Sequence, residues 1–153
     1  VMSNQTADIK NSISRYLSMR EHSRKELIDK LSKKDFEMDS ILQCIDEFSM
    51  KDLQSDYRYT ESFVRSKYNN HKGPNFISAS LKSKGVSGIT IDDVLSLYNE
   101  EDWQSIAIAA LEKKTIYRNI EPSKCKIKQK IFLSGRGFSY KTIEYALNEY
   151  WKK

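Results

Sequence analysis

The chain has 153 residues, of which 39% are hydrophobic, 31% charged and 11% aromatic, and its formal net charge is +5. This composition is typical of a globular protein and excludes a disordered chain, while the length favours one domain or a few small modules. No apolar run approaches the roughly 20 residues that span a bilayer, and the first ten residues lack the apolar stretch of a secretory signal. Cys44 and Cys125 share no metal-type spacing, so we expect reduced thiols and a cytoplasmic location.

Residues 3–50 are predicted to form a first module of three helices. Apolar side chains at Ile13 and Leu17, with Tyr16 beside them, mark the inner side of the first helix. Ser23 and Glu26 form an S-x-x-E capping box, which predicts the start of the second helix.

Residues 53–100 are predicted to form a second module with the same plan. Pro74 is placed to open its middle helix, Gly85 to end that helix, and Thr90 to cap the third helix. The candidate core residues of its first helix are Tyr59, Phe63 and Val64.

Residues 101–153 are predicted to form a third module. Pro122 and Gly137 punctuate its middle helix as Pro74 and Gly85 do, and Ser139 is placed to cap its last helix. The candidate core residues of its first helix are Trp103, Ile106 and Ala110.

One spaced pattern recurs in all three modules, over residues 31–45, 81–95 and 133–147. It reads Leu-x-x-[Lys/Arg]-x-apolar-x4-Ile-x3-[Ile/Leu]. The leucine ends one helix, the apolar residue lies in the turn, and the isoleucine begins the core stripe of the next helix. A period of 50 to 52 residues indicates stacked supersecondary units. The predicted fold is therefore all-α, an elongated tandem array of three three-helix modules.

Four separated motifs carry a resemblance to a known family. They are R-E-H-S-x-x-E-L at 20–27, D-x-R-Y-x-E-S-F-V-R at 56–65, G-P-x-x-I followed by L-K-S-K-G within 73–85, and F-L-x-x-R-G-F-S at 132–139. Together, over residues 14–147, they resemble the RecX family of bacterial recombinase regulators. Two departures are Asp35, where a glycine is usual, and the asparagines of "YNNHKGP", where a more basic stretch is common.

The resemblance implies a function that periodicity does not reveal. Proteins of this kind are small cytoplasmic modulators of RecA, built from tandem three-helix modules that lie along the groove of RecA filaments on single-stranded DNA. They restrain the ATPase, strand-exchange and co-protease activities of the filament and bind DNA weakly and without sequence preference. The resemblance thus implies RecA filaments and single-stranded DNA as partners, a monomer and no catalysis. We also expect no cofactor and no membrane partner.

The positive charge is concentrated in the third module. Residues 101–153 carry 11 Lys or Arg against 6 Asp or Glu, whereas residues 1–52 carry 9 against 10 and residues 53–100 carry 6 against 5. Between Lys113 and Lys141, nine basic residues accompany one acidic residue. A clustered basic surface favours a polyanionic partner, although a solvated helix face is the plain alternative.

The candidate contact residues for nucleic acid or partner protein are therefore cations of the second and third modules. On a helix, Lys124 and Lys128 share one side, while Lys126 and Lys130 share the other. Arg58 has a second interpretation, as the partner of a nearby carboxylate such as Asp56 or Glu61. The full candidate set is Arg58, Arg65, Lys72, Lys82, Lys84, Lys124, Lys126, Lys128, Lys130, Arg136 and Lys141.

Two other functions fit the helical pattern. The stretch "IFLSGRGFSYKTIEYAL" could be a helix-turn-helix that reads duplex DNA at one preferred sequence, or the chain could be a helical-repeat adaptor with no nucleic-acid role. An enzyme is not expected, because no P-loop, G-x-G-x-x-G, H-E-x-x-H or G-x-S-x-G motif is present. His22 and His71 are too far apart in the sequence to suggest a metal set.

Overall fold

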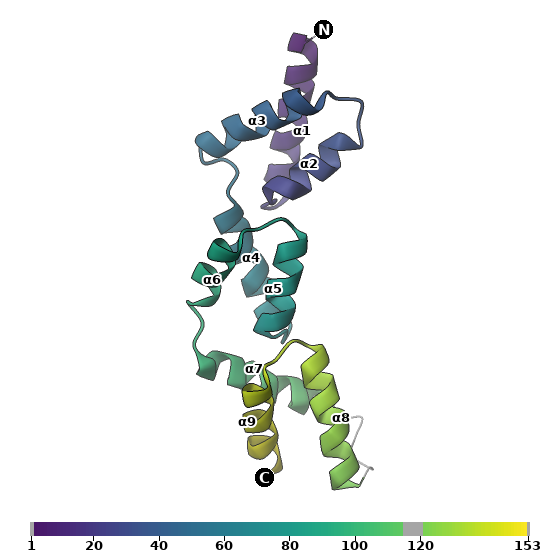
Figure 1. Cartoon of the computed structure of the whole chain (residues 1–153), viewed down its shortest axis with the longest axis vertical. Coiled ribbons are helices and arrows are strands. Elements are labelled where there is room, and N and C mark those ends of the chain that lie inside the picture. The colour runs from purple at the N-terminus through teal and green to yellow at the C-terminus, as the bar shows by residue number, and fades with distance from the viewer. Residues whose placement is uncertain (1, 115–120, 153) are drawn as a thin grey trace. The chain divides into compact units, whose positions relative to one another are not determined.

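A computed structural model describes residues 2–114 and 121–152; Arg118, which belongs to the basic run, lies outside them. These residues form nine α-helices and no strand, which confirms the all-α class. The helices, labelled in Figure 1, are α1 (Met2–Met19), α2 (Arg24–Ser32), α3 (Met38–Met50), α4 (Asp56–Asn69), α5 (Pro74–Ser83), α6 (Gly88–Leu95), α7 (Glu100–Lys113), α8 (Pro122–Gly135) and α9 (Tyr140–Trp151).

The chain divides into two compact units. Unit 1 comprises residues 1–62 and 81–91, and unit 2 comprises residues 63–80 and 92–153. Unit 1 therefore holds α1, α2 and α3, while unit 2 holds α7, α8 and α9, and residues of α4, α5 and α6 contribute to both.

Unit 1 is built around a cluster of buried side chains, nearly all of them aliphatic, from α1, α2 and α3. Figure 1 shows these three helices together at the N-terminal end of the chain. The spacing of four residues between Ile9 and Ile13, between Leu27 and Leu31, and between Ile41 and Ile45 places each pair on one side of its helix. The partly buried residues packed against this cluster are Tyr16, Leu17, Ile28, Phe36 and Phe48. The inner face predicted for the first helix is confirmed.

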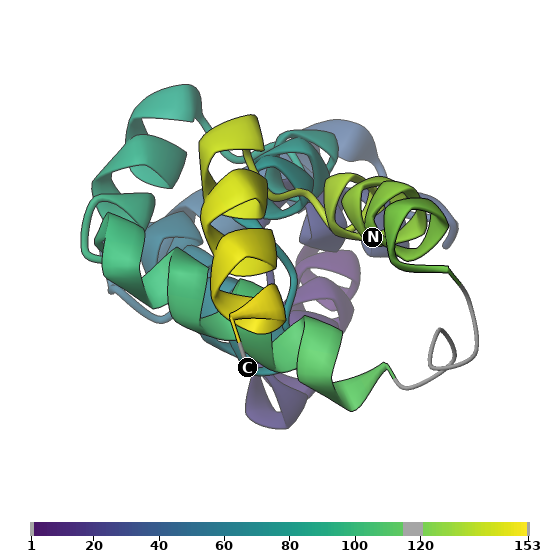
Figure 2. The same ribbon diagram turned by 90° about the horizontal axis from the view of Figure 1, so that it is seen from below.

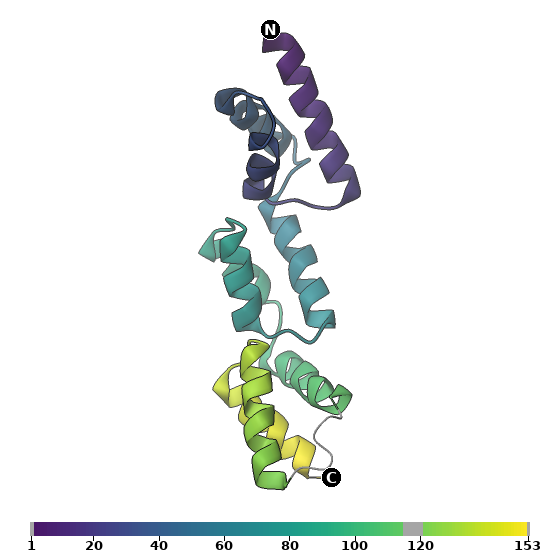
Figure 3. The same cartoon turned by 90° about the vertical axis from the view of Figure 1, so that its right-hand side faces the viewer.

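Unit 2 is organised by α9, which packs across α7 (Figure 2) and beside α8 (Figure 3). The predicted core residues Trp103, Ile106 and Ala110 are buried on α7. Tyr68 and Tyr98 surround Trp103, with ring centroids 5.6 and 5.3 Å from that of the indole. The predicted core of α7 is thus confirmed, with aromatic rings packed around Trp103.

The turn glycines behave as their positions predict. Gly85 and Gly137 have φ values of 80° and 96°, and the N–H that follows each glycine donates to the leucine carbonyl five residues earlier, at 3.1 and 3.2 Å. This is the bonding of a Schellman motif. Asp35 stands at the equivalent position of the first module without a positive φ, and there the turn is closed by the Lys34 N–H on the Leu31 carbonyl at 3.1 Å.

Most of the helix starts are confirmed. The side chain of Ser23 accepts the Glu26 N–H and the Glu26 carboxylate accepts the Ser23 N–H, both at 3.1 Å. Pro74 and Pro122 open α5 and α8, and the Ser139 hydroxyl accepts the N–H three residues on.

The cap expected at Thr90 is wrong. The third helix of the second module begins at Gly88, and the Ser87 hydroxyl accepts the Thr90 N–H at 3.3 Å. Ser87 stands 52 residues before Ser139, so the two caps occupy the same position of the repeat.

In each unit, a residue at the start of one module's middle helix donates a hydrogen bond to the turn that follows the next module's middle helix. The Ser23 hydroxyl donates to the Lys84 carbonyl at 2.8 Å in unit 1, and the Gly73 N–H donates to the Arg136 carbonyl at 2.7 Å in unit 2. The donor residues are 50 apart and the acceptors 52, so a hydrogen bond recurs at equivalent positions of the repeat, from a side-chain hydroxyl in unit 1 and a backbone N–H in unit 2. In unit 2 it holds the α4–α5 loop next to the end of α8.

Candidate nucleic-acid and partner interface

A cationic hollow in unit 2 lies where the α4–α5 loop meets the ends of α7 and α8. Its volume is about 280 Å³, and the described residues around it include no carboxylate, so it suits an anion. The lining residues are Asn70, His71, Ala110, Lys113, Lys114, Phe132 and Arg136.

Arg136 is fixed in place at the edge of this hollow. Its Nε–H donates to the His71 carbonyl at 2.9 Å, its Nη2 donates to the Asn70 carbonyl, and its guanidinium lies 5.5 Å from the centre of the Phe132 ring. Burial lowers the pKa of this guanidinium. A residue proposed as an external contact therefore also closes the α4–α5 loop, with only part of its charge facing solvent.

Lysines near the hollow lie over aromatic rings. Lys114 Nζ is 4.1 Å from the centre of the Phe132 ring, and Lys72 Nζ is 4.5 Å from that of Phe76. Burial lowers the pKa of Lys72, and the charges of Arg136 and a further lysine lower it more. The grouping of Lys72 and Arg136 with the lining lysines concentrates positive charge here, which attracts an arriving anion.

His71 lies beside the same positive charges. It occupies the left-handed region with φ 60°, and burial, Lys113 and Arg136 all lower the pKa of its imidazole. Its carbonyl is already used by Arg136, so its backbone shapes the hollow.

The four lysines of α8 are exposed and fall into the two predicted rows. Lys126 lies 5.4 Å from the Trp151 ring centre and Lys130 Nζ lies 3.2 Å from Glu144 Oε1, so this row is held against α9. Lys124 and Lys128 make no ion pair with the described residues.

Arg58, in unit 1, is engaged within the protein. Its Nε lies 2.9 Å from Glu21 Oε2 and its Nη1 lies 2.9 Å from Asp52 Oδ1, and hydrogen bonds to these two carboxylates raise its pKa. The expected local partners, Asp56 and Glu61, are therefore wrong, although the ion-pair interpretation itself holds.

The remaining candidates are scattered. Lys84 Nζ lies 3.9 Å from Glu26 Oε2, and Lys141 Nζ lies 3.5 Å from Glu100 Oε1. Arg65 and Lys82 are exposed and make no ion pair with the described residues. The structure thus brings together Lys72 and Arg136 in unit 2, and the four lysines along α8, but it does not gather the full predicted set.

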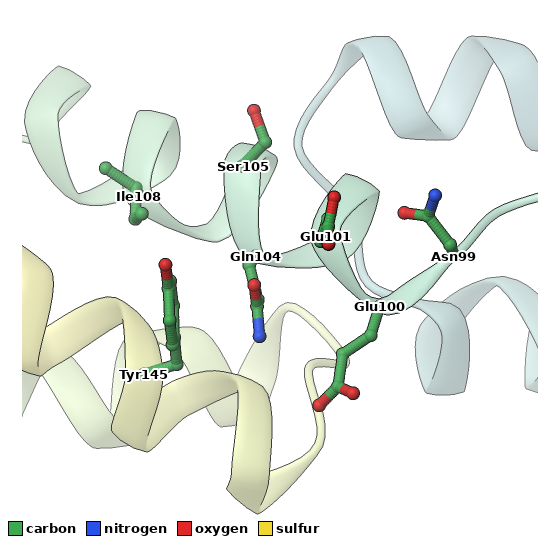
Figure 4. Close-up of a pocket in the computed structure, with 7 residues that line it drawn as sticks. All are labelled: Asn99, Glu100, Glu101, Gln104, Ser105, Ile108 and Tyr145. Atoms are coloured by element: carbon green, nitrogen blue, oxygen red, sulfur yellow. The ribbon is translucent and has the colours of Figure 1, made fainter.

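A second, more open hollow lies between α7 and α9 (Figure 4). Tyr145 extends from α9 toward α7 and Gln104 extends from α7 toward α9. Its volume is about 750 Å³, and its lining residues are Asn99, Glu100, Glu101, Gln104, Ser105, Ile108 and Tyr145. The two carboxylates belong to the first turn of α7, where they interact favourably with the positive end of the helix dipole. Negative charge beside α9 repels phosphate, which disfavours α9 as a DNA-reading helix.

The described residues offer neither a metal-binding cluster nor a membrane-spanning helix. In the parts of the chain that are described, no group of three His, Cys, Asp or Glu side chains could hold a metal ion. Cys44 and Cys125 are both buried and unbridged. None of the described helices is long and apolar enough to cross a membrane.

The sequence pattern misses several residues of the cationic hollow. Lys113 and Lys114 fall inside the basic run without standing out from it, and nothing local marks Asn70 or His71 as lining residues. A signal available in the sequence is Phe132, four residues before Arg136; in the structure Arg136 and Lys114 both lie over its ring.

The described residues define a small all-α protein of repeated three-helix units that carries a cationic surface in its C-terminal part. Models of the RecX family match twice: the first three-helix domain over residues 10–48 and the second over residues 55–95.

Relatives and solved structures extend the match over almost the whole chain. Regulatory protein RecX of Chromohalobacter salexigens is 31% identical, covering 99% of this chain and 98% of its own, and that of Legionella pneumophila is 35% identical, covering 88% and 89%. The crystal structure of RecX from Lactobacillus salivarius has a TM-score of 0.88 at 30% identity and covers 99% of each chain. The chain belongs to the RecX family of regulatory proteins.

Proposed function

We propose that this protein binds filaments of the RecA recombinase on single-stranded DNA and inhibits their ATPase, strand-exchange and co-protease activities. The observation that carries the proposal is family membership over nearly the full chain, at 31% identity to a regulatory protein RecX. The role is non-catalytic and cytoplasmic, within DNA repair, recombination and the SOS response.

The cationic surface supports contact with a nucleoprotein partner. Arg136, Lys113 and Lys114 border a hollow of about 280 Å³ that would accept a phosphate, and exposed lysines on α8 would attract any polyanion. Contacts of this kind are sequence-independent and weaken steeply with salt because they release condensed counterions. Arg65, Lys82 and Lys84 add smaller contributions, whereas Arg58 acts through its ion pairs on the α3–α4 connection.

Inhibition requires that the protein bind inactive filaments more tightly than active ones. A ligand with equal affinity for both states shifts nothing, and a tenfold shift needs a difference of about 1.4 kcal/mol. The protein can supply this difference if its cationic surface meets a groove that differs between the two filament states.

The test is a steady-state titration of the DNA-dependent ATPase of the cognate RecA, with filament binding followed by light scattering. The rate should fall to a plateau as the protein saturates the filament. An unchanged rate together with absent filament binding would defeat the proposal and leave the adaptor function ahead. Protection of one preferred duplex site from nuclease would instead support the helix-turn-helix alternative.

A further inference from the structure

The outer side of α8 carries an apolar ridge that the fold does not use. Cys125, Gln129 and Leu133 are the buried residues of this 14-residue helix. Ile127 and Ile131 are 59% and 68% exposed. At 100° per residue, these two isoleucines lie one turn apart and opposite the buried stripe.

Lysines flank this ridge on both sides. Lys126 and Lys130 lie between the ridge and α9, where Trp151 and Glu144 hold them. Lys124 and Lys128 border its other side, and α8 contains no Asp or Glu. The face is therefore an apolar centre with a cationic rim.

Folding and nucleic-acid binding do not account for the two isoleucines. A β-branched residue is a poorer helix former than the lysines around it, so an exposed helix position gains nothing from it. Phosphates are recognised by charge and hydrogen bonds, to which an aliphatic side chain adds nothing. An apolar centre inside a polar rim is instead the usual arrangement of a protein–protein interface.

We propose that this face of α8 docks an acidic segment of a partner protein, with an apolar side chain of that segment between Ile127 and Ile131. Its carboxylates would lie against Lys124 and Lys128. The inference rests on the proposed function, in that the segment belongs to the recombinase filament. Charge complementarity selects an acidic segment, and one turn of exposed aliphatic surface is too little to hold a helix in a lipid surface.

The test uses the full chain with Ile127→Ser and Ile131→Ser combined. The matched control combines Ile89→Ser and Leu97→Ser, because those side chains are 77% and 66% exposed on other parts of the chain. The first variant should bind cognate RecA filaments at least about tenfold more weakly, since it loses apolar burial at the centre of the interface. The control variant should bind like the parent.

A thymidine oligonucleotide separates the two kinds of contact. Both variants keep every lysine, so oligonucleotide affinity and its salt dependence should stay at the parental values. Far-ultraviolet circular dichroism should show unchanged melting, because both isoleucines are exposed. Neutralising Lys124 and Lys128 with glutamine should weaken binding to filaments and to the oligonucleotide alike.

Each contrary outcome has a distinct meaning. Parental filament affinity in the Ile127→Ser, Ile131→Ser variant overturns the docking surface and leaves the proposed function standing. Failure of the parent to bind filaments overturns both. Binding to vesicles of equal parts phosphatidylcholine and phosphatidylglycerol that is abolished in the variant reassigns the ridge to a lipid surface. Concentration-dependent self-association that is abolished in the variant reassigns it to a second copy of the chain.

Discussion

At the scale of single residues, the leucines that begin the repeat pattern support the core most directly. Leu31 and Leu81 are fully buried, so Leu31→Ala and Leu81→Ala should each lower the free energy of unfolding by about 2–5 kcal/mol. Urea titration followed by circular dichroism measures this, with the exposed Leu97→Ala as a control that should change little. A negligible effect at both leucines would reject the repeat alignment.

A side chain at position 137 would be unfavourable for two reasons. The φ of Gly137 is 96°, and an added Cβ would lie 2.4 Å from the backbone nitrogen and Cβ of Phe76. We therefore expect Gly137→Ala to destabilise the protein by about 1–3 kcal/mol or more. Gly135→Ala is the matched control, because nothing lies within 4 Å of its Cβ position and alanine favours the helix by about 1 kcal/mol. Thermal melts that rank the two variants in the opposite order would contradict the described turn.

His22 should make stability depend on pH. The ring is 1% exposed, its Nδ1 lies 3.0 Å from the Arg20 carbonyl and its Nε2 lies 2.8 Å from Lys30 Nζ. A carbonyl accepts and an ammonium donates, so Nδ1 carries the proton and Nε2 accepts. Burial lowers the pKa of His22, and the charges of Arg20 and Lys30 lower it further, against the opposing effects of the Arg20 carbonyl bond and Glu26.

The sign of this pH dependence follows from proton binding. The unfolded chain takes up a proton near pH 6.5 while the folded ring stays neutral, so stability is full above about pH 7 and falls as the pH drops through 6.5. Unfolding titrations between about pH 5.5 and 7.5 measure this slope, in a His71→Gln background because the pKa of His71 is lowered too. Adding His22→Gln should flatten the slope, and an unaltered slope would exclude His22 as its source.

At the scale of helices, the sequence predicts most of the elements but not all of their ends. The apolar spacing of four residues at Ile41 and Ile45 is a strictly local signal, and so is the S-x-x-E box at Ser23. Thr90 resembles a cap because it precedes an isoleucine, whereas Ser87 takes that role since a helix beginning at Gly88 extends the third element by about one turn. Local chemistry allows either serine or threonine, and tertiary packing decides between them.

The cationic hollow could not be predicted in the same way. Arg136 donates to the carbonyl of His71 across 65 residues of sequence, and no local pattern encodes that bond. Likewise the basic run indicates a polyanion partner but cannot show that Lys130 faces Glu144 whereas Lys124 faces outward. Charge counts predict the sign of the partner, and only the packing of α8 on α9 assigns the lysines to different surfaces.

Helix α8 should carry part of the weak DNA affinity through its outer lysine row. Replacing Lys124 and Lys128 with glutamine should weaken binding to single-stranded DNA and reduce the slope of log affinity against log salt by about 0.7 for each phosphate that is no longer neutralised. Lys33 and Lys51, exposed in unit 1, provide the control pair for the same substitution. Equal effects of the two pairs would mean that net charge alone, and not the α8 surface, attracts DNA.

At the scale of the whole molecule, the sequence repeat divides the chain into three modules, whereas the structure divides it into two compact units. The N–H groups of Gly73 and Asn75 at the start of α5 donate to the carbonyls of Arg136 and Gly137, so residues 63–80 belong with α7, α8 and α9. The turn after α5 instead accepts a bond from Ser23 in unit 1. The middle module is therefore shared, and the module boundaries at 50 and 100 stay a prediction about independent folding.

Truncation after residue 100 tests those boundaries. It removes the acceptors of the Gly73 and Asn75 N–H groups, at 2.7 and 2.9 Å, and the Asp102 carbonyl that accepts the Tyr68 hydroxyl at 3.1 Å. Because a helix start without partners is destabilised, amides of residues 63–80 should lose protection from hydrogen exchange, whereas those of residues 5–50 should keep it through their own buried cluster. Exchange measured by mass spectrometry on the full and truncated chains gives the comparison. Retained protection over residues 63–80 would mean that the middle module folds without the third. The sequence repeat, and not the division into two units, would then define the parts that fold independently.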